Sequence, residues 1–526
     1  MSEKTQTMNR LPCPKCGGFL RKSGATPGGK QRWRCDRTSG CGYGTTNPSA
    51  GTRDQAGNIT GPVRNPQFRR KLSGIKRFVI TAAQNATPIH EDFLSSLQQY
   101  CAFNKAELVV IPIRYKNPTS RWAASQENEE SWDPKLAPYL YNQRKKLCEH
   151  LMLLGDIKTV PTAERPLSGF EAITHGESGI LGHTKLQLTT IPTPQDSQPK
   201  IMTTTGAITV PNYTDSKAGK KGEFHHTLGA VAVDIVGTKF FLRQINADKR
   251  NGDFIDLGQW YTPEEVLDAP PAKALVMGDT HRAQMDPRVE RATFGPEGMA
   301  EVLDPEMLVF HDLHDGRAVN HHERKDPFAQ ISLREEEAHL AEQEVRDDVA
   351  WLQKVGGRRQ VVIVPSNHDD FLTRWLRDVD WRRDPDNAEF YLESALAMVK
   401  QIKQTGKASD VFPYWVDKLR GDSKIRCLGR RESCNISGIE LSLHGDLGPN
   451  GSRGSRQSLR RIGVKTIIGH SHSPGIEEGC YQVGTSSKLN MGYNIGPSSW
   501  MHAHCAVYAN GKRSLLFIVD GQWRFK

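Results

Sequence analysis

Residues 466–474 read TIIGHSHSP, an apolar run of β-strand character that stops at a glycine and is followed by two histidines. Residues i and i+2 of a strand share a face, so His470 and His472 can point at the same object. An isolated H-x-H is more often a polar surface turn. Whether this pair forms a site therefore depends on what the rest of the chain places beside it.

The same arrangement occurs four more times between residues 273 and 448. The segments KALVMGDTH, EMLVFHDLHD, RRQVVIVPSNHDD and GIELSLHGD each read as an apolar strand that ends in Asp, Asn or His. Sites in α/β sheets gather just beyond the carboxyl ends of the strands. Five strand ends with metal-ligand chemistry predict one shared site.

The candidate ligands of this site offer oxygen and nitrogen donors and no thiolate. They are Asp279, His281, Asp312, Asn367, His444, His470 and His472. If one carboxylate bridges, the set gives two ions four protein ligands each. Ions paired about 3.5–4 Å apart can clamp the attacking and leaving oxygens of a phosphoryl transfer. Mixed nitrogen and oxygen ligation favours Mn²⁺, with Fe or Zn²⁺ as alternatives.

The five segments resemble, in order, the D-x-H, GD-x-x-D, GNH(D/E), H and GH-x-H motifs of the calcineurin-like metallophosphoesterases. The resemblance implies an α/β/β/α sandwich over residues 271–526, with Asp312 bridging the two ions. It implies that one ion is held by Asp279, His281, Asp312 and His472, and the other by Asp312, Asn367, His444 and His470. By the same resemblance, His368 protonates the leaving oxygen or stabilises the transition state, and Asp369 orients His368.

Two positions depart from the family pattern, because His311 and Ser366 stand where the motifs have glycine. His311 and His314 also leave open which group of the second motif faces the metals. We favour Asp312, since carboxylates bridge two ions and neutral imidazoles do not.

The net charge of +10 is concentrated at the N-terminus. Residues 1–76 hold 15 Lys and Arg against 3 Asp and Glu, whereas the rest of the chain holds 55 against 57. Such an asymmetry is typical of an arm that faces a polyanion, although a solubilising tail would look similar. DNA is the expected partner.

Residues 1–44 are predicted to form a zinc ribbon. Cys13 and Cys16 form a C-x2-C pair and Cys35 and Cys41 a C-x5-C pair, which together can hold one structural Zn²⁺. The segment is similar to the ribbons of transposase-like and topoisomerase-like proteins. It interleaves groups that can stack on bases and contact phosphates, namely Arg32, Trp33, Arg34 and Arg37. Zinc ribbons also mediate protein contacts, which stays an alternative.

The remaining segments are less informative. Residues 45–74 have the composition of a basic linker, and residues 75–270 read as an α/β accessory region of open role, beginning strand–helix–strand. Residues 335–355 have the apolar spacing of a packing helix. A glycine-rich loop follows His444, and its Arg453 and Arg456 suit phosphate contacts or are simply solvated.

These observations favour a metal-dependent DNase. In mechanism the chain resembles Mre11-like nucleases. In domain layout it resembles phage phosphoesterases that degrade host DNA. A phosphomonoesterase or protein phosphatase with a partner-recruiting ribbon is the alternative, followed by a non-catalytic DNA-binding protein. No apolar run is long enough to span a bilayer and no secretory signal is evident. We therefore expect a cytoplasmic protein, in the host cytoplasm if phage-encoded, with no membrane partner. Self-association stays open.

Overall fold

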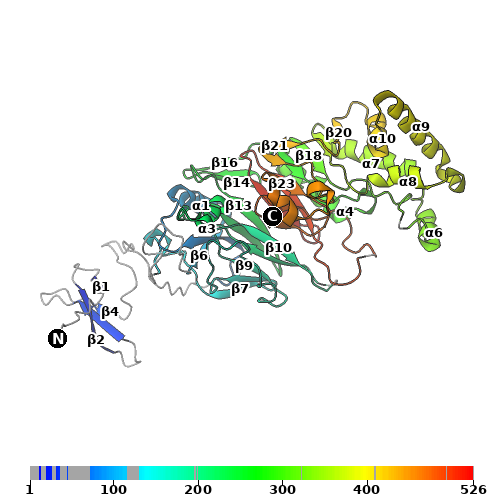
Figure 1. The fold of residues 1–526 in the computed structure, drawn as a ribbon. Helices are drawn as coiled ribbons and strands as arrows, with labels where there is room; N and C mark the ends of the chain where they lie inside the picture. The colour runs from blue at the N-terminus through cyan, green and yellow to red at the C-terminus, as the bar shows by residue number, and fades with distance from the viewer. Residues whose placement is uncertain are drawn as a thin grey trace.

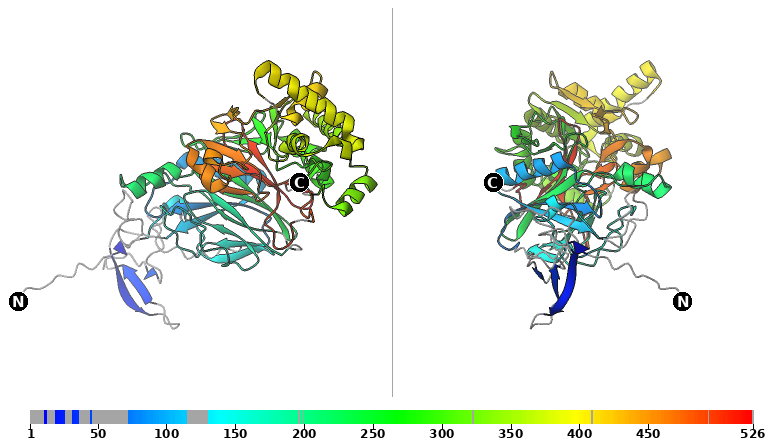
Figure 2. Two further views of the ribbon diagram at one scale, coloured as in Figure 1. Left: turned by 45° about the vertical axis from the view of Figure 1, so that its right-hand side comes forward. Right: turned by 90° about the vertical axis from the view of Figure 1, so that its left-hand side faces the viewer.

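The computed structural model describes residues 11–12, 19–25, 31–35, 44–45, 72–114, 130–194, 197, 199–321, 323–407, 410–492 and 494–524. The chain is a mixed α/β protein, as the sequence predicts, and its strands form several sheets (Figures 1 and 2). No helix within these residues is long and apolar enough to cross a bilayer.

A small antiparallel sheet lies in the predicted ribbon segment. It consists of β1 (Leu11–Pro12), β2 (Phe19–Ala25), β3 (Gln31–Cys35) and β4 (Gly44–Thr45), in that order. Strand β3 carries the exposed Arg32 and Arg34 and the half-buried Trp33 and Cys35. The other predicted zinc ligands, Cys13, Cys16 and Cys41, lie outside the described residues, as does Arg37.

A six-stranded sheet contains the first three predicted site strands. Its order is β20-β19-β18-β17-β26-β27, with β17 to β20 parallel and β26 and β27 antiparallel. The bounds are β17 Ala274–Val276, β18 Met307–Phe310, β19 Gln360–Ile363, β20 Ile425–Cys427, β26 His502–Val507 and β27 Arg513–Ile518. The parallel strands end at one edge, which places the residues that follow them side by side.

A four-stranded sheet of the accessory region continues this layer. It has the order β13-β12-β5-β6, with β5 Arg77–Gln84, β6 Glu107–Ile113, β12 Gly229–Val236 and β13 Lys239–Asn246. Helix α1 (Glu91–Asn104) connects β5 and β6, which confirms the predicted strand–helix–strand. Side-chain hydrogen bonds join β13 to β27, including Asn246 Nδ2 to the Arg513 carbonyl at 2.8 Å.

The second layer is a ten-stranded sheet in the order β21-β22-β23-β25-β24-β10-β11-β9-β8-β7. Its bounds are β7 Arg144–Cys148, β8 Leu151–Leu154, β9 Ser178–Leu181, β10 Gln187–Ile191, β11 Lys200–Thr204, β21 Asn435–Ile436, β22 Ile439–Glu440, β23 Lys465–Ile468, β24 Gly475–Glu477 and β25 Cys480–Gln482. Strand β10 pairs directly with β24. The accessory strands and the last two site strands therefore share one sheet.

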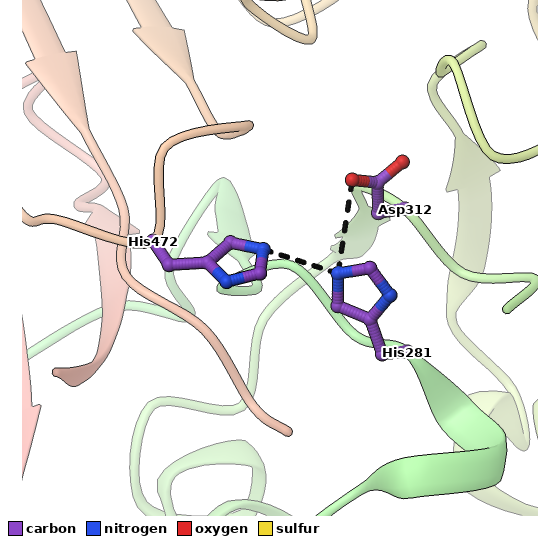
Figure 3. Close-up of side chains that lie close together, drawn as sticks. All are labelled: His281, Asp312 and His472. Carbon is purple, nitrogen blue, oxygen red and sulfur yellow. Dashed lines mark hydrogen bonds and ion pairs between the residues drawn. The ribbon is translucent and has the colours of Figure 1, made fainter. Parts of the chain in front are cut away.

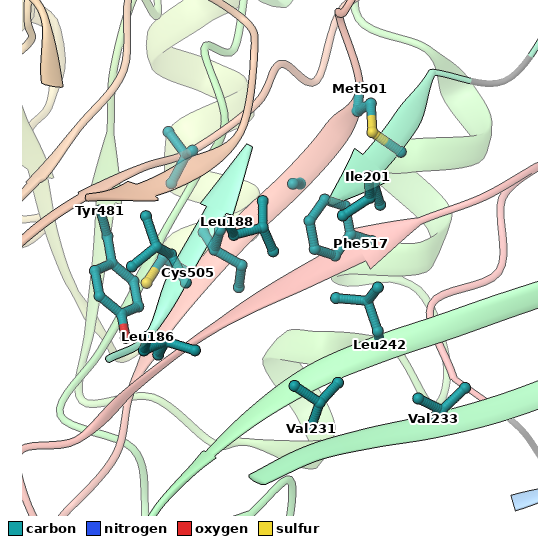
Figure 4. Close-up of a cluster of buried hydrophobic side chains, with 14 of the residues drawn as sticks. Leu186, Leu188, Ile201, Val231, Val233, Leu242, Tyr481, Met501, Cys505 and Phe517 are labelled. Carbon is teal, nitrogen blue, oxygen red and sulfur yellow. The ribbon is translucent and has the colours of Figure 1, made fainter. Parts of the chain in front are cut away.

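The main hydrophobic core fills the space between the two layers. Alternate residues of a strand point to opposite faces, so Phe78 and Ile80 of β5 face this core while Val79 faces α1. Figure 4 shows Leu188 and Ile201 from the ten-stranded sheet lying near Leu242 and Phe517 from the other layer. The accessory region and the site strands are thus held together by a shared core.

Most helices share a core cluster with the six-stranded sheet. They are α4 Pro287–Phe294, α5 Met299–Val302, α7 Ala341–Gly356, α8 Asp370–Asp378, α9 Ala388–Thr405 and α10 Val411–Leu419. Helix α6 Pro327–Glu335 lies away from the sheet (Figure 1). Helix α7 buries Val345, Val349 and Leu352, which confirms the predicted packing helix. Helices α6 to α10 gather at one end of the molecule in Figure 1.

The shorter elements complete the fold. They are the sheet β14 Phe254–Asp256, β15 Gln259–Tyr261 and β16 Val266–Asp268, the helices α3 Lys217–His225 and α11 Arg456–Leu459, and the 3-10 turns η1 Pro134–Leu136, η2 Arg282–Gln284, η3 Trp381–Arg383, η4 Pro385–Asn387, η5 Pro449–Gly451 and η6 Arg460–Ile462.

Candidate metal centre

The predicted ligands converge where the two layers meet. Those that follow β17, β18 and β19 come from the six-stranded sheet, and those that follow β22 and β23 come from the ten-stranded sheet. Three sets of side chains have ligand atoms within 4.8 Å of one another: His281, Asp312 and His472; Asp312, His444 and His470; and His281, Asp315 and His368. The site is therefore built from both sheets.

The first set surrounds a common point. His281 Nε2 lies 3.1 Å from His472 Nε2 and 3.8 Å from Asp312 Oδ2, and the three side chains point toward one another in Figure 3. His472 Nε2 also lies 3.2 Å from Asp279 Oδ2. This arrangement groups Asp279 with the set, as the resemblance implies for one ion.

The second set shares Asp312 with the first. Asp312 Oδ2 lies 3.1 Å from His444 Nε2, and His470 belongs to the same group. The amide oxygen Oδ1 of Asn367 is buried and has no hydrogen-bond partner among the described residues. Asp312 thus has the central position that a bridging carboxylate requires.

The donor chemistry fits divalent ions. Asp312 Oδ1 and both carboxylate oxygens of Asp279 are buried without a hydrogen-bond donor among the described residues. Buried carboxylates are costly unless a cation or donors compensate them. Although burial opposes charge on His444, Asp312 and Asp279 raise its pKa to about 9, so the cluster as a whole attracts positive charge.

Four of the candidate ligands have a strained backbone conformation. His281, Asp312, His470 and His472 have φ values of 41°, 42°, 74° and 57°, in the left-handed region that residues other than glycine seldom adopt. Such strain costs roughly 1–3 kcal/mol per residue and occurs mainly at functional sites. Gly469 is required for a different reason, since a Cβ there would lie 2.0 Å from Asp279 Oδ1.

Asp315 orients His281, and sequence reasoning did not assign it this role. His281 donates from Nδ1 to Asp315 Oδ1 at 3.2 Å, which leaves Nε2 to face the common point. A carboxylate behind a metal-binding imidazole sets its tautomer and increases its basicity. The sequence signal was the second aspartate of the motif HDLHD.

His368 lies at the open side of the cluster. Its side chain is 20% exposed, whereas that of His281 is 1% exposed. His368 Nδ1 lies 3.2 Å from the Asp315 carbonyl oxygen, so Nε2 is the nitrogen available to a substrate. Burial lowers its pKa, and Asp312 partly offsets this.

The hydrogen-bond contact of His368 is with Asp315, whereas Asp369, which the resemblance implies as its orienting group, contacts Ser366. Asp369 Oδ2 instead accepts a hydrogen bond from the Ser366 backbone N–H at 3.0 Å, and its own N–H donates to Ser366 Oγ. Burial and the nearby Asp312 raise the pKa of Asp369 to about 7. Ser366, at the family's glycine position, therefore closes the turn that carries Asn367 and His368.

The two additional histidines of the second motif lie outside all three ligand sets. His311 is buried beside His444, with ring centroids 5.6 Å apart, and burial lowers its pKa to about 4. His314 turns away and donates from Nδ1 to the buried Asp348 Oδ2 at 2.8 Å. The structure therefore places Asp312 at the centre of the cluster and the two histidines around it.

Arginines near the centre have mainly structural contacts. Arg430, which the sequence did not single out, binds Asp446 at 2.7 Å and Asp370 at 2.9 Å and so links two site loops. Arg456 donates to the Ser473 carbonyl at 3.0 Å, next to His472. Arg453 is exposed. Arg453 and Arg456 are the two arginines predicted to contact phosphate, and of these Arg453 is the one exposed to solvent.

The fold and the cluster define a mixed α/β protein with a buried carboxylate–imidazole centre suited to divalent ions. The sequence is 32% identical over 465 residues to Protein A1 of Escherichia phage T5, which covers 85% of this chain and 83% of that protein. The chain belongs to the Protein A1 family. No protein-family model matches the sequence, and no solved structure matches the chain.

Proposed function

We propose that the chain is a metal-dependent phosphodiesterase of the calcineurin-like type that hydrolyses DNA in the host cytoplasm. The observation that carries the proposal is the sharing of Asp312 between two ligand sets built from four separate segments. A shared carboxylate is what a two-ion phosphoesterase centre requires. The phage origin of the relative is compatible with this setting.

The proposed assignment follows the two ligand sets. Asp279, His281 and His472 would hold one ion together with Asp312, and Asn367, His444 and His470 would hold the other with it. When bound, such a pair supplies Lewis-acid stabilisation of the attacking and leaving oxygens of phosphoryl transfer. Mn²⁺ is the proposed metal, because all donors are oxygen or nitrogen.

The chain's own proton donor is His368. The Asp315 carbonyl holds its Nδ1, which leaves Nε2 facing the open side where a leaving oxygen would emerge. In its imidazolium form, His368 can pass the Nε2 proton to that oxygen. Burial lowers the pKa of His368, and Asp312 and Asp315 offset part of that lowering by favouring the charged imidazole.

DNA is the proposed substrate because of the N-terminal charge. Residues 1–76 hold a large excess of Lys and Arg, which can capture a polyanion without sequence preference. A structural Zn²⁺ held by the four N-terminal cysteines is part of this proposal. The proposal does not depend on the cleavage polarity or strand preference.

The test compares three substrates with the purified full-length chain in EDTA and after addition of Mn²⁺. We expect Mn²⁺-dependent hydrolysis of plasmid DNA and of bis(p-nitrophenyl) phosphate, with little hydrolysis of p-nitrophenyl phosphate. A preference for the monoester would instead favour a phosphomonoesterase or protein phosphatase. DNA binding with no hydrolysis of any substrate would contradict the enzymatic proposal.

A further inference from the structure

A cavity of about 360 Å³ lies at the opposite end of β23 from the metal centre. Its walls come from the end of α3, the turn after β13, the start of β23 and the turn between β26 and β27. Lys465 lines the cavity and His470 belongs to the metal cluster. At about 3.3 Å per strand residue, the two positions are roughly 16 Å apart. The cavity is therefore a separate feature.

The lining of this cavity is strongly cationic. Its basic side chains are Lys185, Lys249, Arg460, Lys465, Lys512 and Arg513, and the one carboxylate among its lining residues is Glu478. Glu478 is already engaged by Lys185 at 3.2 Å and Arg460 at 2.9 Å. Lys185 and Arg460 therefore already neutralise the negative charge of Glu478.

The remaining three lysines have no carboxylate within ion-pair distance in the described part of the chain. These are Lys249, Lys465 and Lys512. Desolvation in the cavity, followed by repulsion from Lys512, lowers the pKa of Lys249. Desolvation and the neighbouring Arg513, Lys512 and Lys249 lower the pKa of Lys465. Concentrated like charges of this kind are relieved by a bound anion.

The base of the cavity is rigid. Arg513 donates to the carbonyl oxygens of Thr466 at 2.8 Å and Gly479 at 3.0 Å, and its guanidinium lies 4.0 Å from the centre of the Tyr481 ring. Asn246 binds the Arg513 carbonyl. Arg513 thus adds a fixed positive charge beside the three lysines, and such a cluster of cationic donors suits phosphate oxygens.

An aromatic side chain completes the cavity at its rim. Phe224, near the end of α3, is 81% exposed although it is a large apolar residue, and it also lines the cavity. Aromatic rings exposed beside cationic side chains provide stacking surfaces for nucleobases, and each stacked base contributes about 1–3 kcal/mol.

We propose that this cavity is a second nucleotide-binding site, in which the three lysines contact phosphate groups and Phe224 stacks on the base. The site goes beyond the proposed hydrolytic function and does not depend on the metal centre. The phosphate can belong to a free mononucleotide or to a DNA strand, and the two sources share the same recognition chemistry.

Calorimetric titration of the full-length chain tests the proposal in buffer without added divalent ions. The probes are dAMP, inorganic pyrophosphate and an eight-residue oligothymidylate. We expect all three to bind, with affinities that fall as salt increases. Replacement of Lys249, Lys465 and Lys512 by Gln should weaken dAMP binding by at least about tenfold, since three charged contacts are lost. Phe224→Ala should weaken dAMP binding but leave pyrophosphate binding unchanged.

A matched control removes the same charge elsewhere. Lys354, Lys407 and Lys424 are exposed and distant in sequence from the cavity lining, and their joint replacement by Gln should leave dAMP binding unchanged. Equal weakening in both triple variants, or no binding of dAMP at millimolar concentration, would overturn the proposal. Competition between dAMP and the oligothymidylate would identify a strand as a source, whereas binding of dAMP alone would identify the mononucleotide.

The outcome is separable from that of the proposed hydrolysis. The triple cavity variant should hydrolyse bis(p-nitrophenyl) phosphate like the unmodified protein, because no metal-centre residue is changed. Absence of hydrolysis in the unmodified protein would contradict the proposed function and leave nucleotide binding at the cavity unaffected.

A second inference rests on helix α9, which has an apolar stripe facing solvent. Leu392, Leu396, Val399 and Ile402 are 46%, 53%, 48% and 45% exposed, whereas Phe390, Ser394 and Met398 of the same helix are buried. The stripe repeats at three or four residues, so its members lie on one face, with the spacing of a coiled-coil seam. A monomer would leave this face in water.

The charges beside the stripe point to a second copy of the chain as its partner. Glu389 is exposed in the first half of α9, and Lys400 and Lys403 are exposed in the second half. Glu393 is half-buried and already paired with Lys418 of α10, so Glu389 is the acidic group open to a partner. Two antiparallel copies would place each acidic half against a basic half. We infer that two chains associate through α9 in this orientation, about a twofold axis.

The mass of the full-length protein in sedimentation experiments tests this inference. Leu396→Glu with Val399→Glu should abolish the association, whereas Phe328→Glu on α6, which removes another exposed apolar side chain, should leave it intact. Glu389→Lys should weaken the association, and adding Lys403→Glu should restore it. A monomeric unmodified protein, or an unchanged mass in the α9 double variant, would overturn the inference.

Discussion

The two ring nitrogens of His281 have different partners, and the carboxylate of Asp315 determines which nitrogen carries the proton. Asp315 accepts the Nδ1–H bond, so the Nε2 lone pair faces His472 and Asp312. Asp315 also presents its carbonyl oxygen to His368. One buried aspartate therefore contacts both a candidate metal ligand and the proposed proton donor.

Replacing Asp315 tests this positioning role. Asp315→Ala should lower metal affinity by about 10–100-fold, the usual effect of losing such a supporting carboxylate. Asp315→Asn keeps an acceptor oxygen and should recover part of the loss. Titration with Mn²⁺, followed by calorimetry, measures both. Equal affinities in the alanine variant and the unmodified protein would contradict the assignment.

Asp312 should matter more than any other ligand, because it belongs to both sets. We expect Asp312→Ala to lose both ions, and elemental analysis of the desalted protein after Mn²⁺ loading measures their content. Asp417→Ala removes an exposed carboxylate of α10 and is the matched control. Retention of two ions and full activity in Asp312→Ala would refute the site.

His368 should affect turnover and not metal content. His368→Ala is expected to reduce turnover of bis(p-nitrophenyl) phosphate by roughly 10²–10⁴-fold, the range of general acid catalysis. The bound Mn²⁺ should stay near that of the unmodified protein. If metal is lost to the same extent as activity, His368 is a ligand and another group donates the proton.

At the scale of elements, the centre depends on how closely strand ends from two sheets approach. The residue after β23 is Gly469, and its Cα faces Asp279, which follows β17. A side chain at this position would separate the two sheets at the point where the ligands meet. Gly469 of TIIGHSHSP therefore ends the strand and also allows the ligands from the two sheets to lie close together.

Gly469→Ala tests the close approach. The added Cβ would lie 2.0 Å from Asp279 Oδ1 and 3.2 Å from His311 Cβ, so the carboxylate of Asp279 would have to shift from its place in the cluster. We expect metal affinity to fall by at least about tenfold, comparable with other disturbances of ligand orientation. Gly176→Ala, where a Cβ meets nothing within 4 Å, should have no effect. Circular dichroism of both variants checks that the fold is kept.

The regular elements were largely predictable from local pattern. The segment from β5 through α1 to β6 and helix α7 appear where apolar spacing places them. Strand β22 is shorter than the alternating run in GIELSLHGD indicates, with Ile439–Glu440 as its bounds. The strand ends at Glu440 because its pairing with neighbouring strands ends at that residue. Where pairing ends depends on the tertiary structure and cannot be seen in the local sequence pattern.

At the scale of the whole molecule, the N-terminal arm and the two-layered body should be functionally separable. Removal of residues 1–70 is the suitable truncation, because Leu72 is buried in the core between the sheets. The truncated chain should bind DNA more weakly, and each lost phosphate contact should reduce the log–log salt slope by about 0.9. Hydrolysis of bis(p-nitrophenyl) phosphate should persist, since every metal-centre residue remains.

The single substitution Cys13→Ser tests the same N-terminal arm as the truncation. Loss of one thiolate should disrupt a zinc-dependent fold and reproduce the weaker DNA binding. Unchanged DNA affinity and salt slope in both variants, with loss of a protein partner, would make the arm a recruitment module and favour the phosphatase alternative.

The sequence by itself determined the set of candidate donors, the order of the strand ends and the N-terminal concentration of charge, because each of these is a property of residue type and spacing. It could not determine which atom of each donor faces the site. His368 contacts the Asp315 carbonyl while Asp369 contacts Ser366, and this depends on how two loops from different strands approach each other. The sequence also predicted a domain boundary near residue 270, whereas β10 before this boundary pairs with β24 after it. Pairing between strands more than two hundred residues apart follows from burial of a shared core, which only the tertiary structure decides.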